Sequence, residues 1–344
     1  MRRGAAYGMA RRKRKGARNK PRATGIDWDM SKLGPLEGKL VVLVGGSGFL
    51  GTHTAQALLQ RGARLRVASR HPEKAWHLKP LANLGQIQFA RCNVLDRKSV
   101  EAVMQGADAA AYLVGAFSGD LATLHGDAAG WAAEAAAAGG AQSFAYVSAI
   151  GADMESDSTY AATKARGEEQ VRAAFPGASV LRPSLMFGED DEFLNMFARL
   201  MVMLPVMPVF APQSKVQPVW VDDVAEGLAN ALADPRAHGG KTFELAGPEQ
   251  MTMLELHERI AAAQQRKRTF VAMPDALSAV FAALPLTPMN SDQWRMLKAG
   301  NVASGSAPGL RELGQPAHPL GLFLERWMVR YRRHGRFGGE RASA

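Results

Sequence analysis

The stretch Val41-Val42-Leu43-Val44-Gly45-Gly46-Ser47-Gly48-Phe49-Leu50-Gly51 decides the fold of this chain. A β-rich apolar run enters a glycine cluster, and a helical pattern follows to about Gln60. We expect Gly45 to turn the chain off the strand, Gly48 to admit a pyrophosphate and Gly51 to let the helix approach the sheet. The free N–H groups of the helix then face the phosphates. The predicted contacts of this turn are Gly45, Ser47, Gly48, Phe49, Leu50 and Gly51.

Strand and helix patterns alternate around this stretch. Such alternation predicts parallel βαβ units with helices on both faces, and therefore a Rossmann-type doubly wound α/β fold. The predicted strands are 40–44, 64–69, 87–92, 109–114, 144–148 and 178–181, and the predicted helices are 49–61, 99–105, 121–139 and 160–174.

The amino-acid composition changes after Pro183, where proline and methionine become frequent. We therefore expect a Rossmann domain over 37–183 and a smaller, mostly helical lobe over 184–332, followed by a basic tail over 333–344. Two apolar segments, Met196–Pro208 and Phe270–Pro285, are interpreted as part of the hydrophobic core. The alternative is that they form an exposed apolar surface that meets lipid, quinone or a membrane subunit.

The net charge of +10 is concentrated at one end of the 344-residue chain. Residues 1–22 contain ten Lys or Arg and no acid, whereas the rest of the chain is balanced. Residues 1–36 are therefore interpreted as a disordered basic arm and linker. A basic arm can bind nucleic acid, anionic lipid or an acidic protein. The arm has only Tyr7 as an aromatic residue, so nucleic-acid binding is not favoured.

Targeting signals and the number of cysteines indicate the cellular compartment. The apolar part of the arm is too short for a secretory signal, so secretion is not expected. No segment reaches 18 charge-free apolar residues, so no transmembrane helix is expected. The lone Cys92 cannot form an intrachain disulfide, which favours a reducing compartment.

The end of the second strand, Ser69-Arg70-His71, indicates the type of nucleotide. An acid at this position holds the ribose 2′-OH of NAD, whereas an arginine accommodates the 2′-phosphate of NADP. Arg70 stands there, and its guanidinium matches a phosphate bidentately. NADP(H) is therefore the preferred cofactor, with NAD(H) as the alternative.

Tyr160 and Lys164 form a Y-x-x-x-K pattern on a predicted helix, so both side chains share one face. A nearby ammonium is expected to lower the phenol pKa so that Tyr160 acts as acid or base, and Lys164 also suits the nicotinamide ribose. Ser148 ends the fifth strand, where its hydroxyl can orient a substrate carbonyl. The predicted catalytic residues are Ser148, Tyr160 and Lys164.

Over residues 38–330 the chain resembles a short-chain dehydrogenase/reductase of the extended or atypical branch. The markers are the glycine turn, the three catalytic candidates, Arg182-Pro183-Ser184 and the stretch Val219–Val224. Asn93 replaces the acid that often contacts adenine in this superfamily, and an amide can still pair with the adenine edge. The cofactor contacts that the resemblance implies beyond the glycine turn are Arg70, Asn93, Val94, Gly115, Tyr160, Lys164 and Pro183.

Two further stretches, His77–Gln86 and Phe187–Asn195, resemble one subgroup, the nucleotide-binding accessory subunit of respiratory complex I (NADH:ubiquinone oxidoreductase). This resemblance implies a tightly held NADPH of structural or redox-sensing role. It also implies complex I subunits, the membrane surface and quinone as partners. The implied location is peripheral, on the cytoplasmic face of a bacterial inner membrane or on the matrix side of a mitochondrial one.

Three functions stay open at this point. The first is a complex I-associated protein that retains NADPH, and the second is a free NADP-dependent reductase or epimerase that uses Tyr160. The third is a non-enzymatic regulator that acts through the arm. The eight histidines are scattered and the lone cysteine has no partner, so no metal site is expected.

Overall fold

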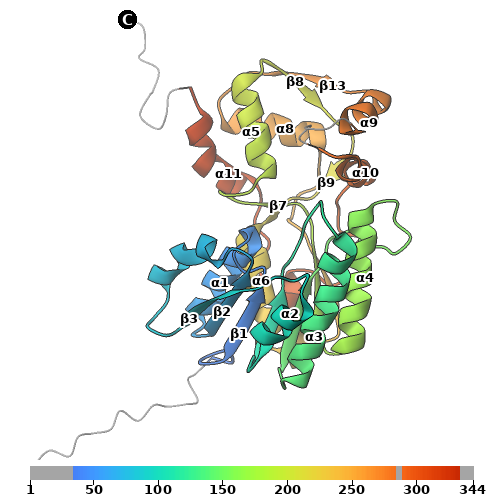
Figure 1. The fold of residues 1–344 in the computed structure, drawn as a ribbon. Coiled ribbons are helices and arrows are strands. Elements are labelled where there is room, and N and C mark those ends of the chain that lie inside the picture. The colour runs from blue at the N-terminus through green and yellow to red at the C-terminus, as the bar shows by residue number, and fades with distance from the viewer. Residues whose placement is uncertain (1–33, 284–288, 334–344) are drawn as a thin grey trace, which may run out of the picture. The chain divides into compact units, whose positions relative to one another are not determined.

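The computed structural model describes residues 34–283 and 289–333. Its centre is a seven-stranded sheet with the order β11-β6-β5-β4-β1-β2-β3 (Figure 1). Every pair of neighbouring strands in this sheet is parallel. The predicted doubly wound Rossmann fold is therefore confirmed. The predicted basic arm and almost all of the basic tail lie outside the described residues.

The sheet and its helices follow the predicted order. The strands are β1 (Leu40–Val44), β2 (Arg64–Ser69), β3 (Ile87–Arg91), β4 (Ala109–Tyr112), β5 (Ser143–Val147), β6 (Ser179–Pro183) and β11 (Thr242–Leu245). The helices on its two faces are α1 (Phe49–Gln60), α2 (Arg97–Met104), α3 (Ala128–Ala138), α4 (Thr159–Ala174) and α6 (Val221–Ala233).

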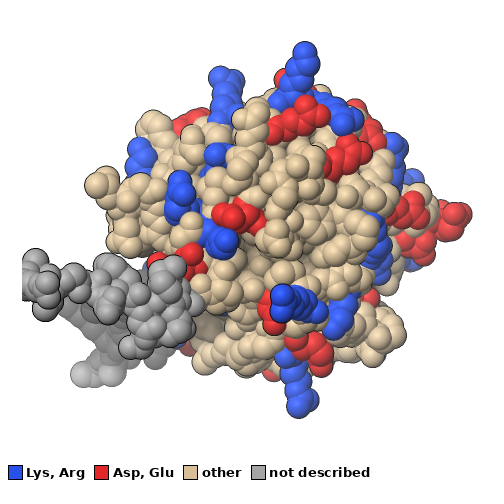
Figure 2. All heavy atoms as spheres, turned by 90° about the horizontal axis from the view of Figure 1, so that it is seen from below, with Lys and Arg blue, Asp and Glu red and all other residues tan. Residues whose placement is uncertain are grey.

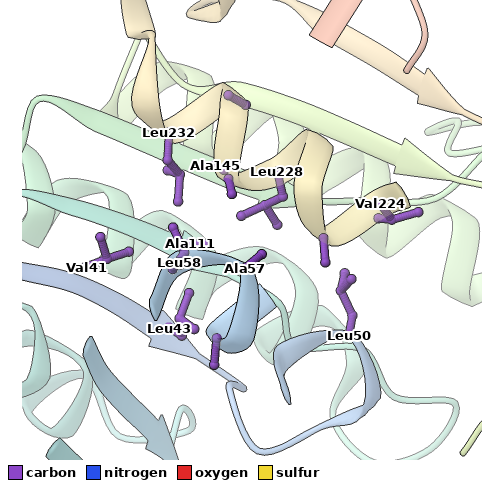
Figure 3. Packing of buried hydrophobic residues seen from close by; sticks show 14 of the residues in the cluster. Val41, Leu43, Leu50, Ala57, Leu58, Ala111, Ala145, Val224, Leu228 and Leu232 are labelled. Carbon is purple, nitrogen blue, oxygen red and sulfur yellow. The ribbon is translucent and has the colours of Figure 1, made fainter. Parts of the chain in front are cut away.

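The two faces of the sheet are covered by different helices because strand side chains alternate. Val41 and Leu43 of β1 pack with α1 and α6, and Figure 3 shows Leu58 and Leu228 of these helices at this face. Val42 and Val44 point the other way, into a cluster with α2 and α3. The alanine-rich sequence of α3 suits this cluster, since small side chains let a helix lie close to a sheet.

The helix predicted over 121–139 is present, but its first part is not α-helical. Residues Ala122–Asp127 form a π-helical turn, η3, and α3 follows it. In this turn the carbonyl oxygen of the fully buried His125 accepts a hydrogen bond from the Tyr146 hydroxyl at 2.9 Å. A tertiary contact of this kind leaves no trace in a helical periodicity.

A 3-10 helix, η2 (Pro72–Leu81), lies between β2 and β3 and contains part of the stretch His77–Gln86. Buried Gln86 donates from Nε2 to the carbonyl oxygens of Leu59 and Ala63, both at 3.0 Å. The Leu59 carbonyl oxygen also accepts from the Gly62 N–H at 3.0 Å, so Gln86 adds a side-chain bond to the turn that ends α1. The stretch therefore holds the end of α1 against the edge of the sheet.

Residues after position 183 build both the sheet and a second cluster. β11 extends the sheet beside β6, and α6 covers it. The helices α5 (Phe193–Met203), α8 (Met253–Ala263), α9 (Asp275–Ala283), α10 (Ser291–Ala299) and α11 (Gly321–Met328), with short strand pairs, form what we call the small lobe. Its main core includes Leu194, Met201, Leu256, Ile260 and Trp327.

The remaining elements are short connections. They are β7 (Met186–Phe187), β8 (Val206–Val209), β9 (Lys215–Val216), β10 (Val219–Trp220), α7 (Pro235–His238), β12 (Met251–Thr252), β13 (Thr269–Ala272), η4 (Arg311–Leu313) and η5 (Val329–Tyr331).

The surface shows charges of both signs side by side. On the face drawn in Figure 2, lysines and arginines are interspersed with aspartates and glutamates over a mostly uncharged surface. Within residues 34–283 and 289–333, no helix has both the length and the apolar character that crossing a bilayer requires.

Candidate nucleotide site at the carboxyl edge of the sheet

The glycine turn has the geometry that its sequence predicts. Gly45 adopts a φ of 85°, which an L-side chain rarely adopts, and it turns the chain away from β1. A Cβ on Gly51 would lie 2.6 Å from the Cα of Gly46 and 2.7 Å from the carbonyl oxygen of Gly45. Helix α1 therefore starts against the turn at a distance that only glycine permits.

The first turn of α1 is open to a ligand. Gly48 is the N-cap residue, and among the described residues no side chain accepts a hydrogen bond from the first N–H groups of the helix. Ser47, Phe49 and Leu50 lie in the same turn. Unsatisfied N–H groups and the positive end of the helix dipole favour a phosphate at this place.

The end of β2 carries two polar groups that suit an adenosine ribose. Arg70 is exposed, and it forms no hydrogen bond or ion pair with the residues that the structure describes. The hydroxyl of Ser69 is buried and has no protein partner in the same part of the chain. The sequence predicted a role for Arg70 in binding the nucleotide but not for Ser69. The burial of the Ser69 hydroxyl is visible only in the structure.

Three more strand ends contribute to the same edge. Asn93 follows β3 and is exposed, and its side-chain oxygen accepts from the N–H of Leu95 at 3.3 Å. Val94 beside it is buried, Gly115 follows β4, and Pro183 ends β6. Parallel strands place all of these positions at one edge, and ligands of doubly wound sheets bind outside that edge.

Tyr160 lies in the first turn of α4, and Lys164 lies one turn later. A Cβ on Gly115 would lie 3.7 Å from the Tyr160 hydroxyl oxygen and 4.0 Å from the Lys164 Nζ. The fold thus brings the phenol, the ammonium and the loop after β4 together. Lys164 is buried, and its Nζ donates to the carbonyl oxygens of Val114 and Val147, both at 2.9 Å.

The expectation that Lys164 lowers the pKa of Tyr160 is wrong. Burial raises the pKa of Tyr160 to about 12. Burial also lowers the pKa of Lys164 to about 7, against an opposing effect of Glu168. The effect of burial on the phenol is therefore not offset by the nearby Lys164.

Ser148 follows β5 and is almost fully buried, with 2% of its surface exposed. Its hydroxyl has no hydrogen-bond partner among the described residues. A buried hydroxyl without a partner is costly, so this group fits a role in which a ligand completes its hydrogen bonding.

His125 belongs to this site, although sequence reasoning found only scattered histidines. Its Nε2 accepts a hydrogen bond from the N–H of Ala116 at 3.1 Å, and its Nδ1 lies 2.9 Å from the Thr163 hydroxyl. Its ring meets the Tyr160 ring edge-on, with 5.0 Å between centroids. Burial, followed by the charge of Lys164, lowers the pKa of His125 to about 3. His125 is therefore neutral and ties the loop after β4 to α4.

These features fit a nicotinamide dinucleotide. An open helix N-terminus suits the pyrophosphate, Arg70 and Ser69 suit the adenosine ribose, and Lys164 suits the nicotinamide ribose. Within the described residues, no three His, Cys, Asp or Glu side chains are arranged to hold a metal ion.

Comparison with known proteins agrees with this geometry. A family model described as NAD(P)H-binding matches residues 45–186, and the RmlD substrate binding domain matches residues 140–294. Subunit 9 of the NADH dehydrogenase [ubiquinone] 1 alpha subcomplex, mitochondrial, from Arabidopsis thaliana is 31% identical over 323 residues, which cover 87% of this chain and 80% of that protein. The rat protein of the same name is 30% identical over 83% of this chain and 79% of its own length.

The chain belongs to the subunit 9 family. It is therefore an NAD(P)H-binding protein with the atypical short-chain dehydrogenase/reductase fold, and the resemblance seen in sequence is confirmed.

Other relatives of this subunit 9 family member have different names. The "Ceramide reductase" of Caulobacter vibrioides is 35% identical over 203 residues, covering 57% of this chain and 62% of that protein. Among solved structures, the NADPH-dependent quinone oxidoreductase of Escherichia coli complexed with NADPH has a TM-score of 0.67 at 19% identity, covering 83% of this chain and 99% of its own. At that identity the likeness establishes the fold alone.

Proposed function

We propose that this subunit 9 family member binds NADPH at the carboxyl edge of its sheet and works in association with respiratory complex I. The observation that carries the proposal is the match to subunit 9 proteins over more than four-fifths of the chain. In this proposal the protein lies peripherally on the membrane that holds complex I, with complex I subunits, the membrane surface and quinone as its neighbours.

NADPH is the proposed cofactor because of the groups at the end of β2. Arg70 has no acidic partner among the described residues, so its guanidinium is free to bind a 2′-phosphate. No carboxylate follows β2 directly, where NAD-binding proteins place the group that holds the ribose 2′-OH.

Retention of the nucleotide rather than turnover is supported by the state of Tyr160. A phenol whose pKa is raised to about 12 is a weak general acid at neutral pH, and proton transfer is most efficient when the pKa lies near the working pH. Tyr160 and Lys164 then serve to hold the nicotinamide ribose.

Native purification from membranes tests this proposal. We expect the protein to co-purify with complex I and mass spectrometry to find NADPH in about one copy per chain. A protein recovered free of complex I, with a nucleotide that is oxidised when a carbonyl substrate is added, contradicts the proposal.

The second candidate is an NADP-dependent reductase of a carbonyl group. Two observations favour it: the relative named ceramide reductase at 35% identity, and the buried, unpartnered hydroxyl of Ser148, which suits a substrate carbonyl. Here Tyr160 gives its proton to the carbonyl oxygen and Ser148 orients that oxygen, while bound NADPH supplies the hydride.

The variant Tyr160→Phe separates the two candidates. For the reductase we expect NADPH oxidation with a long-chain ketone to fall by at least about a hundredfold, the scale of general acid catalysis, while NADPH stays bound. Turnover that is unchanged in Tyr160→Phe contradicts the reductase.

A further inference from the structure

Helix α10 of the small lobe places a carboxylate at the start of the helix that carries Tyr160. Asp292 accepts hydrogen bonds from the Thr159 N–H at 2.8 Å, the Tyr160 N–H at 3.0 Å and the Ser158 hydroxyl at 3.1 Å. Its side chain is only 18% exposed. Three donors from one turn of α4 therefore converge on a carboxylate that lies more than 130 residues away in sequence.

These bonds exceed what α4 needs in order to begin. Ser158 is already the N-cap, and its hydroxyl accepts from the Ala161 N–H at 3.2 Å. Two of the donors to Asp292, the N–H groups of Thr159 and Tyr160, are first-turn groups that usually bond to water. A carboxylate there also meets the positive end of the helix dipole. Asp292 thus fixes the backbone of Tyr160 itself.

The same end of α10 contacts the other side of Tyr160. Asn290 donates from Nδ2 to the carbonyl oxygen of Phe117 at 3.3 Å. The Phe117 ring stacks on the Tyr160 ring, with 4.7 Å between centroids. A capping box between Asn290 and Gln293 fixes the start of α10. The small lobe therefore contacts Tyr160 at its backbone N–H through Asp292, and it reaches the ring only indirectly, through Phe117.

We propose that Asp292 is a positioning residue, through which the small lobe sets the place of Tyr160 at the nicotinamide end of the nucleotide. The inference rests on the proposed binding of NADPH with Tyr160 and Lys164 at the nicotinamide ribose. It adds that the nicotinamide half of the site is completed from the small lobe, whereas the adenosine half, at the ends of β2 and β3, is independent of Asp292.

Two ligands distinguish the halves of the site. NADPH reaches Tyr160, whereas adenosine 2′,5′-bisphosphate carries the 2′-phosphate and adenine but no nicotinamide. In Asp292→Ala we expect the Kd for NADPH to rise about tenfold, the scale of lost charge-assisted hydrogen bonds, and the Kd for adenosine 2′,5′-bisphosphate to stay within about twofold. Asp292→Asn keeps one acceptor oxygen at the same length, and we expect an intermediate Kd for NADPH. Isothermal titration measures both ligands on the full chain.

Thr252→Ala is the matched control, since Thr252 also caps a small-lobe helix, α8, and accepts from the Glu255 N–H at 3.2 Å. We expect it to leave both Kd values unchanged. Equal losses for the two ligands in Asp292→Asn, or no loss for NADPH in either Asp292 variant, overturn the positioning role. A wild-type protein that binds neither ligand refutes the proposed function instead.

Discussion

At the scale of single residues, the site depends on Gly51 and Lys164, whose surroundings suit no other side chain. Gly51 lies against backbone atoms of the glycine turn, which cannot move aside as a flexible side chain does. Lys164 is an ammonium buried between two carbonyl oxygens at the ends of β4 and β5. Each of these two residues therefore leads to a specific prediction.

Gly51→Ala should destabilise the protein by about 2–3 kcal/mol, because its Cβ would overlap the backbone of Gly45 and Gly46. Chemical denaturation measures this loss. Gly321→Ala is the control, since nothing lies within 4 Å of a Cβ built there and the residue begins helix α11. Equal stability of the two variants would contradict the close approach of α1 to the turn.

Lys164 should make stability rise with pH above neutrality. In the folded protein its pKa is lowered to about 7, while in the unfolded chain the lysine keeps its proton to about pH 10. The unfolded state therefore binds more protons above pH 7, and stability rises by up to about 1.4 kcal/mol per pH unit. Below pH 7 the cost of the buried charge is present in full.

Urea unfolding between pH 7 and 8.5 tests this pH dependence. The difference in stability between wild type and Lys164→Met should change with pH in this window, because methionine has no proton to lose. A constant difference across the window would show that Lys164 stays protonated in the folded protein.

At the scale of elements, α4 is tied to the sheet by a buried ion pair. Glu168, which is 2% exposed, accepts from the Arg182 Nε at 2.7 Å and its Nη2 at 2.8 Å. Arg172 adds a third bond at 3.2 Å. This bidentate pair fixes the register of α4 against β6, and with it the position of Tyr160 and Lys164 over the sheet edge.

Glu168→Gln should destabilise the protein by about 2–4 kcal/mol, because Arg182 then lacks its counter-charge in a partly buried place. The control is Glu101→Gln, which removes an exposed i,i+4 partner of Arg97 and should cost no more than about 0.5 kcal/mol. Thermal unfolding compares the two, and a similar small loss in both would show that the α4–β6 pair contributes only as a surface pair does.

At the scale of the whole molecule, the proposed nucleotide touches the ends of strands from both halves of the sheet. A ligand that binds only the folded state stabilises it by about 2.7 kcal/mol at a hundredfold excess over its Kd. At equal concentration, NADPH should raise the unfolding temperature more than NADH does. In Arg70→Ala this difference should disappear, and a wild type that responds equally to both nucleotides would contradict the 2′-phosphate preference.

The sequence by itself determined the parallel sheet, the glycine turn and the place of Tyr160 and Lys164, because these depend on local periodicity and on short spacings along the chain. It also showed the family, through short motifs along the chain. It predicted the helix over 121–139 but not the π-helical geometry of its first part, where the buried His125 ties two segments together. It also failed at the pKa of Tyr160. The burial that raises this pKa is seen only in the tertiary structure, whereas the nearby lysine is visible in the sequence.

Only the tertiary structure decided how the segments before and after Pro183, within the described residues, come together around the sheet and the site. Strand β11 joins the sheet beside β6, although the sequence after Pro183 reads as another lobe. Asp292 reaches the first turn of α4 across more than 130 residues. Such contacts arise from the packing of elements distant in sequence, and hydrogen bonds between them leave no periodic signal in either segment.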